Sequence, residues 1–269
     1  MTRNDIIVAL NTLGYEVKVH DVVKNGVKLE GIIFKNEKVS PVIYINNFIS
    51  KSEKRTAEEV AMDIIKLYRE TKKYPLDVKK TIEKPFVLSN IRIGLQKAGS
   101  EPLVKRVCEN LKGLEMYLFV MGKDKYRNYS FKIFPSFLKF IHVSEDEAWM
   151  YAEKNTFSNI KLLPIEQMIG GSVDESKEGE QESALYTLTN KENFKGASSI
   201  LNKEVLRGFA QKFGVEKIIA VPSSIHEFLL FPYMSDCDIE MINKTIKAIN
   251  ASEVLAEEQL ADRVFVLEI

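Results

Sequence analysis

The sequence contains few of the residues that mark disulfide-stabilised, fibrous or disordered chains. Its 269 residues include two cysteines, 13 glycines and eight prolines, and 45% of them are hydrophobic. This composition excludes wholesale disorder and a fibrous repeat. Cys108 and Cys237 lie far apart and have no CxxC spacing. We therefore expect two reduced, packed thiols rather than a disulfide framework.

Long hydrophobic runs are also missing. No stretch approaches 18 consecutive apolar residues, and the segment that begins Met1-Thr-Arg-Asn-Asp lacks the apolar core of a secretory signal. Secretion and membrane insertion are therefore not expected. The predicted location is the cytoplasm.

The chain has no net charge, because 38 Lys and Arg residues balance 38 Asp and Glu residues. This balance argues against a uniformly basic nucleic-acid-binding protein. The charge is nevertheless uneven. Residues 1–143 hold 26 basic and 16 acidic side chains, a net of +10, whereas residues 144–269 hold 12 and 22, a net of −10. Complementary halves of this kind would allow self-association through oppositely charged lobes.

Capping residues, glycines and apolar periodicity predict the secondary structure. Thr2 or Asn4, Thr56, Ser144, Asn202, and Asp236 or Asp238 are placed to begin helices. The expected inner face of the last helix includes Ile249. Strands are expected at 16–23, 27–34, 41–45, 87–95, 104–107, 114–121, 130–134, 185–188, 198–201, 217–221, 225–231 and 263–269, with Pro222 as a break.

The composition changes between Gly170 and Glu182. This stretch has one valine, one lysine and five acidic side chains in 13 residues, so it is expected to form a flexible loop or linker. We predict a basic N-terminal lobe over 1–169, an acidic linker over 170–183 and an acidic C-terminal lobe over 184–269. Hairpins and helices do not alternate as regular βαβ units, which predicts an α+β fold with mixed or antiparallel sheets covered by helices.

The most site-like stretch is Pro222-Ser-Ser-Ile-His-Glu227. A catalytic interpretation makes Ser223 or Ser224 a nucleophile, His226 its base and Glu227 an orienting carboxylate. On an extended strand, however, Glu227 points to the opposite face from His226. The alternative is a strand corner whose hydroxyls satisfy local backbone donors, and we favour that alternative.

Metal and cofactor motifs are missing from the sequence. His20, His142 and His226 have no metal-ligand spacing, and the glycines do not form a phosphate-binding loop. We expect neither a metal nor a cofactor.

A basic stretch with interleaved aromatics lies between residues 123 and 139. Lys123, Lys125 and Arg127 alternate with Tyr126 and Tyr129. Phosphate contacts combined with base stacking are typical of single-stranded nucleic-acid binding. The other interpretation is a hairpin with its aromatics inward and its lysines in water.

Several motifs together resemble a known family. They are Leu185-Tyr-Thr-Leu-Thr-Asn-Lys191, Gly196-Ala-Ser-Ser-Ile-Leu201, Pro222-Ser-Ser-Ile-His-Glu227, Asn250 with 257–260 and Asp262, Ser144-Glu-Asp-Glu-Ala-Trp149 and Asn155-Thr156. The chain resembles an uncharacterised bacterial family, a domain of unknown function seen in anaerobic bacteria and often near mobile elements. The resemblance covers roughly residues 90–265, and the first 90 more loosely. It implies a cytoplasmic bacterial or mobile-element protein.

The resemblance assigns no catalytic residue. It directs attention to Asn190, Ser223, Ser224, His226 and Glu227. The leading hypothesis is a non-catalytic protein-binding or regulatory module with a protein partner. A hydrolase that uses Ser223–Glu227 and a single-stranded nucleic-acid-binding protein that uses 123–139 are the alternatives.

Overall fold

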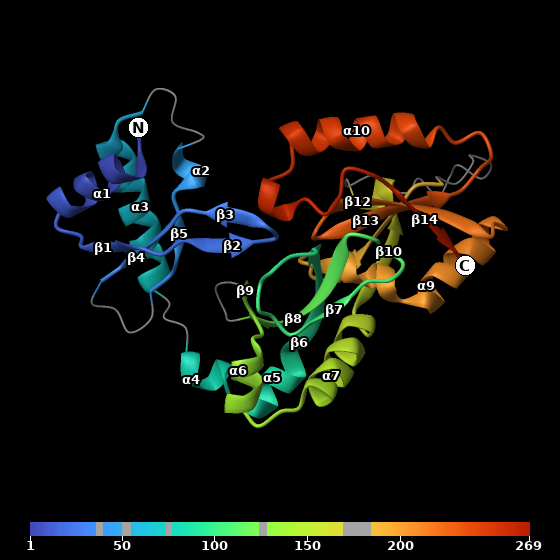
Figure 1. The fold of residues 1–269 in the computed structure, drawn as a ribbon, viewed down its shortest axis with the longest axis horizontal. Helices are drawn as coiled ribbons and strands as arrows, with labels where there is room; N and C mark the ends of the chain where they lie inside the picture. The colour runs from blue at the N-terminus through green and yellow to red at the C-terminus, as the bar shows by residue number, and fades with distance from the viewer. Residues whose placement is uncertain (36–39, 50–54, 74–76, 124–127, 169–183) are drawn as a thin grey trace. The chain divides into compact units, whose positions relative to one another are not determined.

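The computed structural model describes residues 1–35, 40–49, 55–73, 77–123, 128–168 and 184–269. The chain divides into two compact units, Met1–Val78 and Lys79–Ile269. The fold class is α+β, as predicted, and all strand pairs of the described residues are antiparallel (Figure 1). None of the helices among these residues has the length and apolar character needed to cross a membrane.

The first unit packs two helices on a small sheet. Its elements are α1 (Arg3–Thr12), β1 (Val17–Val19), β2 (Val22–Lys24), β3 (Val27–Leu29), β4 (Gly31–Phe34), β5 (Ile43–Tyr44), α2 (Asn46–Ile49) and α3 (Ala57–Lys72). The sheet order is β1-β4-β5, and β2 and β3 form a separate hairpin. As predicted, Asn25 and Gly26 form its turn, both with positive φ. Thr2 and Thr56 cap α1 and α3 through capping boxes.

The second unit begins with a four-stranded sheet, called here the first sheet. Its elements are α4 (Val78–Thr81, which spans the unit boundary), α5 (Lys84–Asn90), β6 (Ile91–Lys97), β7 (Lys105–Val107), β8 (Leu114–Lys123), β9 (Asn128–Lys132), α6 (Pro135–Phe140) and α7 (Glu145–Phe157). Strand β8 pairs with β6 on one side and with both β7 and β9 on the other. Helices α5, α6 and α7 bury their apolar faces against this sheet around Leu118 and Trp149.

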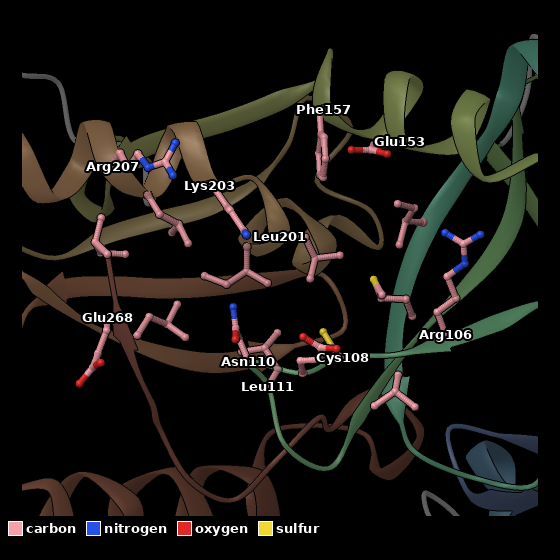
Figure 2. A pocket seen from close by; sticks show the side chains of 18 of the residues that line it. Arg106, Cys108, Asn110, Leu111, Glu153, Phe157, Leu201, Lys203, Arg207 and Glu268 are labelled. Atoms are coloured by element: carbon pink, nitrogen blue, oxygen red, sulfur yellow. The ribbon is translucent and has the colours of Figure 1, made fainter. Parts of the chain in front are cut away.

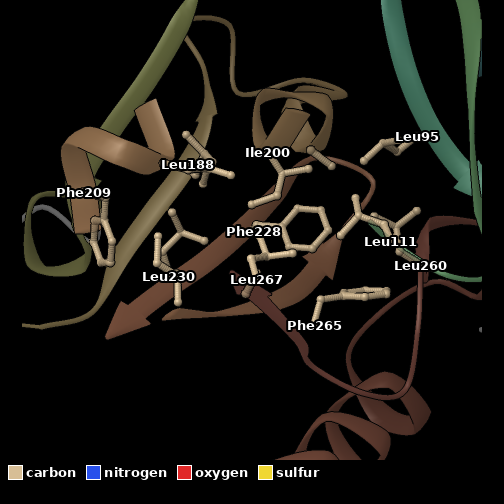
Figure 3. Packing of buried hydrophobic residues seen from close by; sticks show 14 of the residues in the cluster. Leu95, Leu111, Leu188, Ile200, Phe209, Phe228, Leu230, Leu260, Phe265 and Leu267 are labelled. Atoms are coloured by element: carbon tan, nitrogen blue, oxygen red, sulfur yellow. The ribbon is translucent and has the colours of Figure 1, made fainter. Parts of the chain in front are cut away.

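The rest of the second unit forms a five-stranded sheet, called here the second sheet, in the order β10-β11-β13-β12-β14. Its elements are β10 (Ile160–Pro164), α8 (Ile165–Met168), β11 (Tyr186–Asn190), the 3₁₀-helix η1 (Gly196–Leu201), α9 (Lys203–Phe213), β12 (Lys217–Ser224), β13 (Glu227–Pro232), α10 (Ile239–Ser252), the 3₁₀-helix η2 (Ala256–Glu258) and β14 (Phe265–Glu268). Figure 3 shows Phe228, Leu230 and Leu267 of this sheet packed with Ile200 and Phe209.

Four local predictions were wrong. Residues 87–90 end helix α5 rather than begin a strand, and 198–201 belong to η1, where small residues allow close packing on β11. Pro222 lies inside β12 rather than breaking it. Proline has no backbone N–H to donate, but β14 pairs with β12 only as far as Ala220, so no hydrogen bond between β12 and β14 is lost at Pro222. Ile249, placed on the inner face of the last helix, is 49% exposed.

The compact units do not coincide with the lobes predicted around 170–183. Strand β10 lies before that segment and β11 after it, yet they pair over five residues within the second unit. The charges also divide differently. Residues 1–78 hold 13 basic and 11 acidic side chains, a net of +2, and residues 79–269 hold 25 and 27, a net of −2. The charge asymmetry along the sequence therefore does not separate the two units.

Candidate functional site

The loop between β11 and η1 contains Asn190, the first of the residues that the motifs single out. Asn190 is buried, its amide donates to Phe194 O at 2.8 Å, and its carbonyl oxygen accepts the Phe194 N–H at 3.1 Å. Phe194 packs on a cluster of the first sheet that includes Phe119. Lys195 Nζ lies 4.8 Å from the Phe119 ring centroid and donates to Ser130 Oγ at 3.1 Å. Asn190 therefore shapes a loop that fastens the two sheets together.

An ion pair also holds the same loop. Glu192 pairs with Arg92 of β6 at 3.1 Å and accepts a hydrogen bond from the Asn159 amide. Burial would raise the pKa of Glu192, but the hydrogen bonds from Arg92 and Asn159 and the charge of Arg92 hold it below its usual value. The pair therefore adds an ionised link between the first sheet and the loop.

His226 lies in the turn between β12 and β13 and contacts this loop. Its Nδ1 accepts the backbone N–H of Lys195 at 3.0 Å, and its Nε2 lies 3.4 Å from Glu258 Oε1. The tautomer that fits both contacts has its proton on Nε2. The backbone is fixed as well, because His226 O accepts from Thr189 Oγ1 at 2.8 Å. Both ring nitrogens are thus occupied by structural partners.

The neighbouring hydroxyls do not complete a catalytic triad. Ser223 Oγ donates to Glu227 Oε1 at 3.3 Å, and Ser224 Oγ accepts the backbone N–H of His226 at 3.0 Å. Among the described residues, neither hydroxyl forms a hydrogen bond with the imidazole. The structure brings Asn190, Ser223, Ser224, His226 and Glu227 into one region of the second sheet, with contacts typical of a strand corner.

The basic and aromatic stretch is only partly described. Lys125, Tyr126 and Arg127 lie outside the described residues. Lys123 is exposed at the end of β8. A Cβ on Gly122 would fall within 3.0 Å of the Tyr129 ring, so that ring covers Gly122. Further along, Lys132 is paired with Glu101 at 2.8 Å.

A pocket of about 800 Å³ opens elsewhere on the second unit and is the larger of the two described pockets. We call it the β14 pocket, because β14 lines it together with β7, the start of α9 and the end of α7 (Figure 2). Its floor is apolar and belongs to the main core, with Leu111, Ile200 and Leu206 all buried. None of the residues proposed from the sequence lies in it.

The rim of the β14 pocket is polar and charged. Lys203 and Arg207 lie four residues apart on α9, so they share a face of the helix. Neither has an ion pair or side-chain hydrogen bond within the described ranges of the chain. Glu109 and Glu153 also line the pocket, and Glu268 pairs with Lys217 at 2.8 Å. A hydrogen bond from Lys217 lowers the pKa of Glu268, so that carboxylate is already neutralised by a partner.

Arg106 closes the far side of the pocket from β7. Its guanidinium lies 4.5 Å from the Trp149 ring centroid and 3.4 Å from Asp146. The buried Cys108 follows it, and burial raises the pKa of the Cys108 thiol to about 11. The thiol is therefore an unreactive part of the lining at neutral pH.

Little in the sequence indicates this pocket. Lys203 and Arg207 are visible as a basic pair directly after the Asn202 cap, but such pairs are common on exposed helices. The pocket depends on the approach of β7 and β14, which are far apart in sequence. Among the residues that the structure describes, no cluster of three or more His, Cys, Asp or Glu is arranged to hold a metal ion.

The comparisons with known proteins give a family and no activity. No curated protein and no solved structure matches the chain. The model of DUF5688, a family of unknown function, matches residues 3–268. This match includes both units, and it confirms the resemblance to an uncharacterised family that the motifs of the second unit indicate. The chain belongs to the DUF5688 family of unknown function.

Proposed function

We propose that this protein is a non-catalytic binding module that takes a protein partner at the β14 pocket. The observation behind the proposal is the contrast between two regions. The polar groups around His226 are hydrogen-bonded to one another and to the loop that joins the sheets. In the β14 pocket, Lys203 and Arg207 have no partner within the described residues and lie beside an apolar floor.

Unpaired charge beside a concave apolar surface supports a role in binding a partner rather than in holding the fold together. Exposed lysine and arginine side chains give charge complementarity, while the apolar floor supplies the area that association buries. The motifs around Asn190 and His226 are then explained by the fold, since they fix the loop between the sheets. The cytoplasmic, bacterial and mobile-element setting that the resemblance implies is part of this proposal.

The test is a quantitative capture experiment with the full chain and an extract of its own cells. The tagged protein is compared with a variant carrying Lys203→Glu and Arg207→Glu. A matched control carries Lys244→Glu and Lys247→Glu on the exposed face of α10. We expect a protein that is retained by the original chain and the control and is reduced at least about tenfold by the pocket variant, because each charge reversal replaces attraction by repulsion.

Two results would contradict the proposal. The first is hydrolytic turnover by the purified chain that is lost in Ser224→Ala while the fold is retained. The second is salt-dependent retention of single-stranded DNA that disappears when Lys123, Lys125 and Arg127 are neutralised together, because it would place function on the basic stretch instead.

A further inference from the structure

We propose that the β14 pocket binds an extended peptide segment of the partner, which adds as a strand to the free edge of β14 and places acidic side chains against Lys203 and Arg207. The inference rests on the proposed function and names the chemistry of its ligand. Four observations support it, namely the direction of the β14 amides, the edge of β7, the size of the pocket and the distribution of charge.

The hydrogen-bond directions of β14 leave one edge open. Ile269 N–H donates to Glu216 O at 3.1 Å, and Leu267 stands opposite Ile218 in the same register. Alternation along an antiparallel ladder therefore turns the backbone groups of Leu267 toward β12 and those of Val266 and Glu268 away from it. In the described part of the chain, β14 is the last strand of the second sheet. The outward groups of Val266 and Glu268 are available to an added strand.

Among the residues that the structure describes, β7 is also an edge strand, and it borders the same pocket. Cys108 N–H donates to Leu114 O and Leu118 N–H donates to Val104 O, so the backbone groups of Arg106 face β8 and those of Val107 face outward. Val107 as a whole residue is 77% exposed. Both open edges line the pocket, which makes it a slot bordered by backbone donors and acceptors.

The size of the pocket fits a short strand. Four extended residues measure about 13 Å in length, with roughly 5 Å to the neighbouring strand and 10 Å between packed layers, or roughly 650 Å³. The pocket encloses about 800 Å³. The slot is therefore large enough for about four residues of a partner, and a peptide needs no rearrangement of the core to enter.

The positive charges of Lys203 and Arg207 favour acidic side chains in the peptide. Phe265 and Leu267 point into the main core, on the side of the sheet where Leu206 of α9 packs. Alternate residues of an added strand would point the same way, toward α9 and the apolar floor. Figure 2 shows Lys203 extending from α9 into the pocket. Acidic residues on that face would meet Lys203 and Arg207, and β-branched apolar residues would cover Ile200 and Leu206.

The first experiment is a selection from a display library of random octapeptides on the full-length chain. We expect selected peptides to be enriched in Asp or Glu placed two residues from Val, Ile or Thr, because residues two apart on a strand share the face toward α9. Their affinity should fall at least about tenfold on Lys203→Glu with Arg207→Glu and change less than twofold on Lys244→Glu with Lys247→Glu. The absence of such peptides, or peptides that bind both variants equally, would overturn the inference.

The second experiment measures amide hydrogen exchange at single residues by NMR with the tightest selected peptide. The amides of Val266 and Glu268 should exchange rapidly in the free protein and slow at least about tenfold when the peptide binds. The Leu267 amide, already bonded to β12, serves as the internal control and should change little. If the peptide binds and the exchange rates of the Val266 and Glu268 amides do not change, the peptide binds without strand addition and the inference is overturned.

These results are distinguishable from failure of the proposed function. A partner captured through Lys203 and Arg207 in the absence of selected peptides would keep the proposed function and remove strand addition. Capture that is equal for the original chain and the pocket variant, in the absence of selected peptides, would remove both.

Discussion

At the scale of single residues, Gly196 shows how tightly the loop between β11 and η1 is packed. A Cβ at this position would lie within 3.0 Å of Thr189 Oγ1, the Asn190 backbone nitrogen and the His226 carbonyl oxygen. Two of these are backbone atoms that cannot move away cheaply. We predict that Gly196→Ala lowers the free energy of unfolding by about 3 kcal/mol in denaturant titrations.

The matched control is Gly208→Ala, in the middle of α9, where no atom lies within 4 Å of the added Cβ. This replacement should raise the free energy of unfolding by about 0.5–1 kcal/mol, because alanine favours the helix. Equal effects of the two replacements would contradict the packing described for Gly196.

Cys108 gives a prediction that depends on pH. Burial raises the pKa of its thiol from the ordinary 9.0 to about 11, so at pH 8 its thiolate fraction should be about 100-fold below that of an unperturbed thiol. In a Cys237→Ala background, alkylation followed by mass spectrometry should therefore be about 100-fold slower than in the unfolded chain. The rate should rise about tenfold per pH unit between pH 8 and pH 10. Alkylation at the rate of a free thiol would contradict the burial of Cys108.

The candidate site divides into a part that sequence patterns indicate and a part that they do not. The motifs point to Asn190, Ser224 and His226, and two of the hydrogen bonds there are local along the chain, from Phe194 N–H to Asn190 and from His226 N–H to Ser224. The role of the imidazole depends on Lys195, and the pocket depends on Lys203 facing Val107 across distant segments. Contacts of that kind leave no local pattern in the sequence.

At the scale of the elements, β14 is an edge strand with one bonded and one open side. Val266→Pro removes an outward N–H and should lower the free energy of unfolding by less than about 1 kcal/mol. Leu267→Pro removes a backbone hydrogen bond to β12. It should lower the free energy of unfolding by about 3 kcal/mol more than Leu267→Ala, which removes only the side chain. Thermal unfolding of the three variants checks this prediction. A large loss in Val266→Pro would show that the outward amide has a partner.

Elements with caps were predicted more successfully than elements decided by packing. The helix beginnings at Thr56, Ser144 and Asn202 are confirmed, since side-chain capping hydrogen bonds are local interactions. The prediction of a strand at 198–201 was wrong because the apolar and small residues of this segment suit either a buried strand or a 3₁₀-helix. Contact with β11, including the hydrogen bond from Ser199 to Thr189 O at 2.8 Å, decides between them.

At the scale of the whole molecule, the boundary after Val78 predicts which fragments fold. The cores around Leu118 and around Phe228 both belong to residues 79–269. We predict that this fragment unfolds cooperatively in a thermal melt followed by circular dichroism. Fragments 1–169 and 184–269 should not both fold, because they separate β10 from β11, whose five residues are all buried. Cooperative unfolding of 184–269 alone, with aggregation of 79–269, would contradict the boundary.

The central claim is that the β14 pocket binds the partner while the groups around His226 support the fold. The most direct test is the dissociation constant of the captured partner for three full-length proteins: the original chain, Lys203→Glu with Arg207→Glu, and His226→Asn. Asparagine keeps an acceptor for the Lys195 N–H, so His226→Asn should bind within about twofold of the original chain. The pocket variant should bind at least about tenfold more weakly. The reverse order, with binding lost in a folded His226→Asn protein and kept in the pocket variant, would contradict the account.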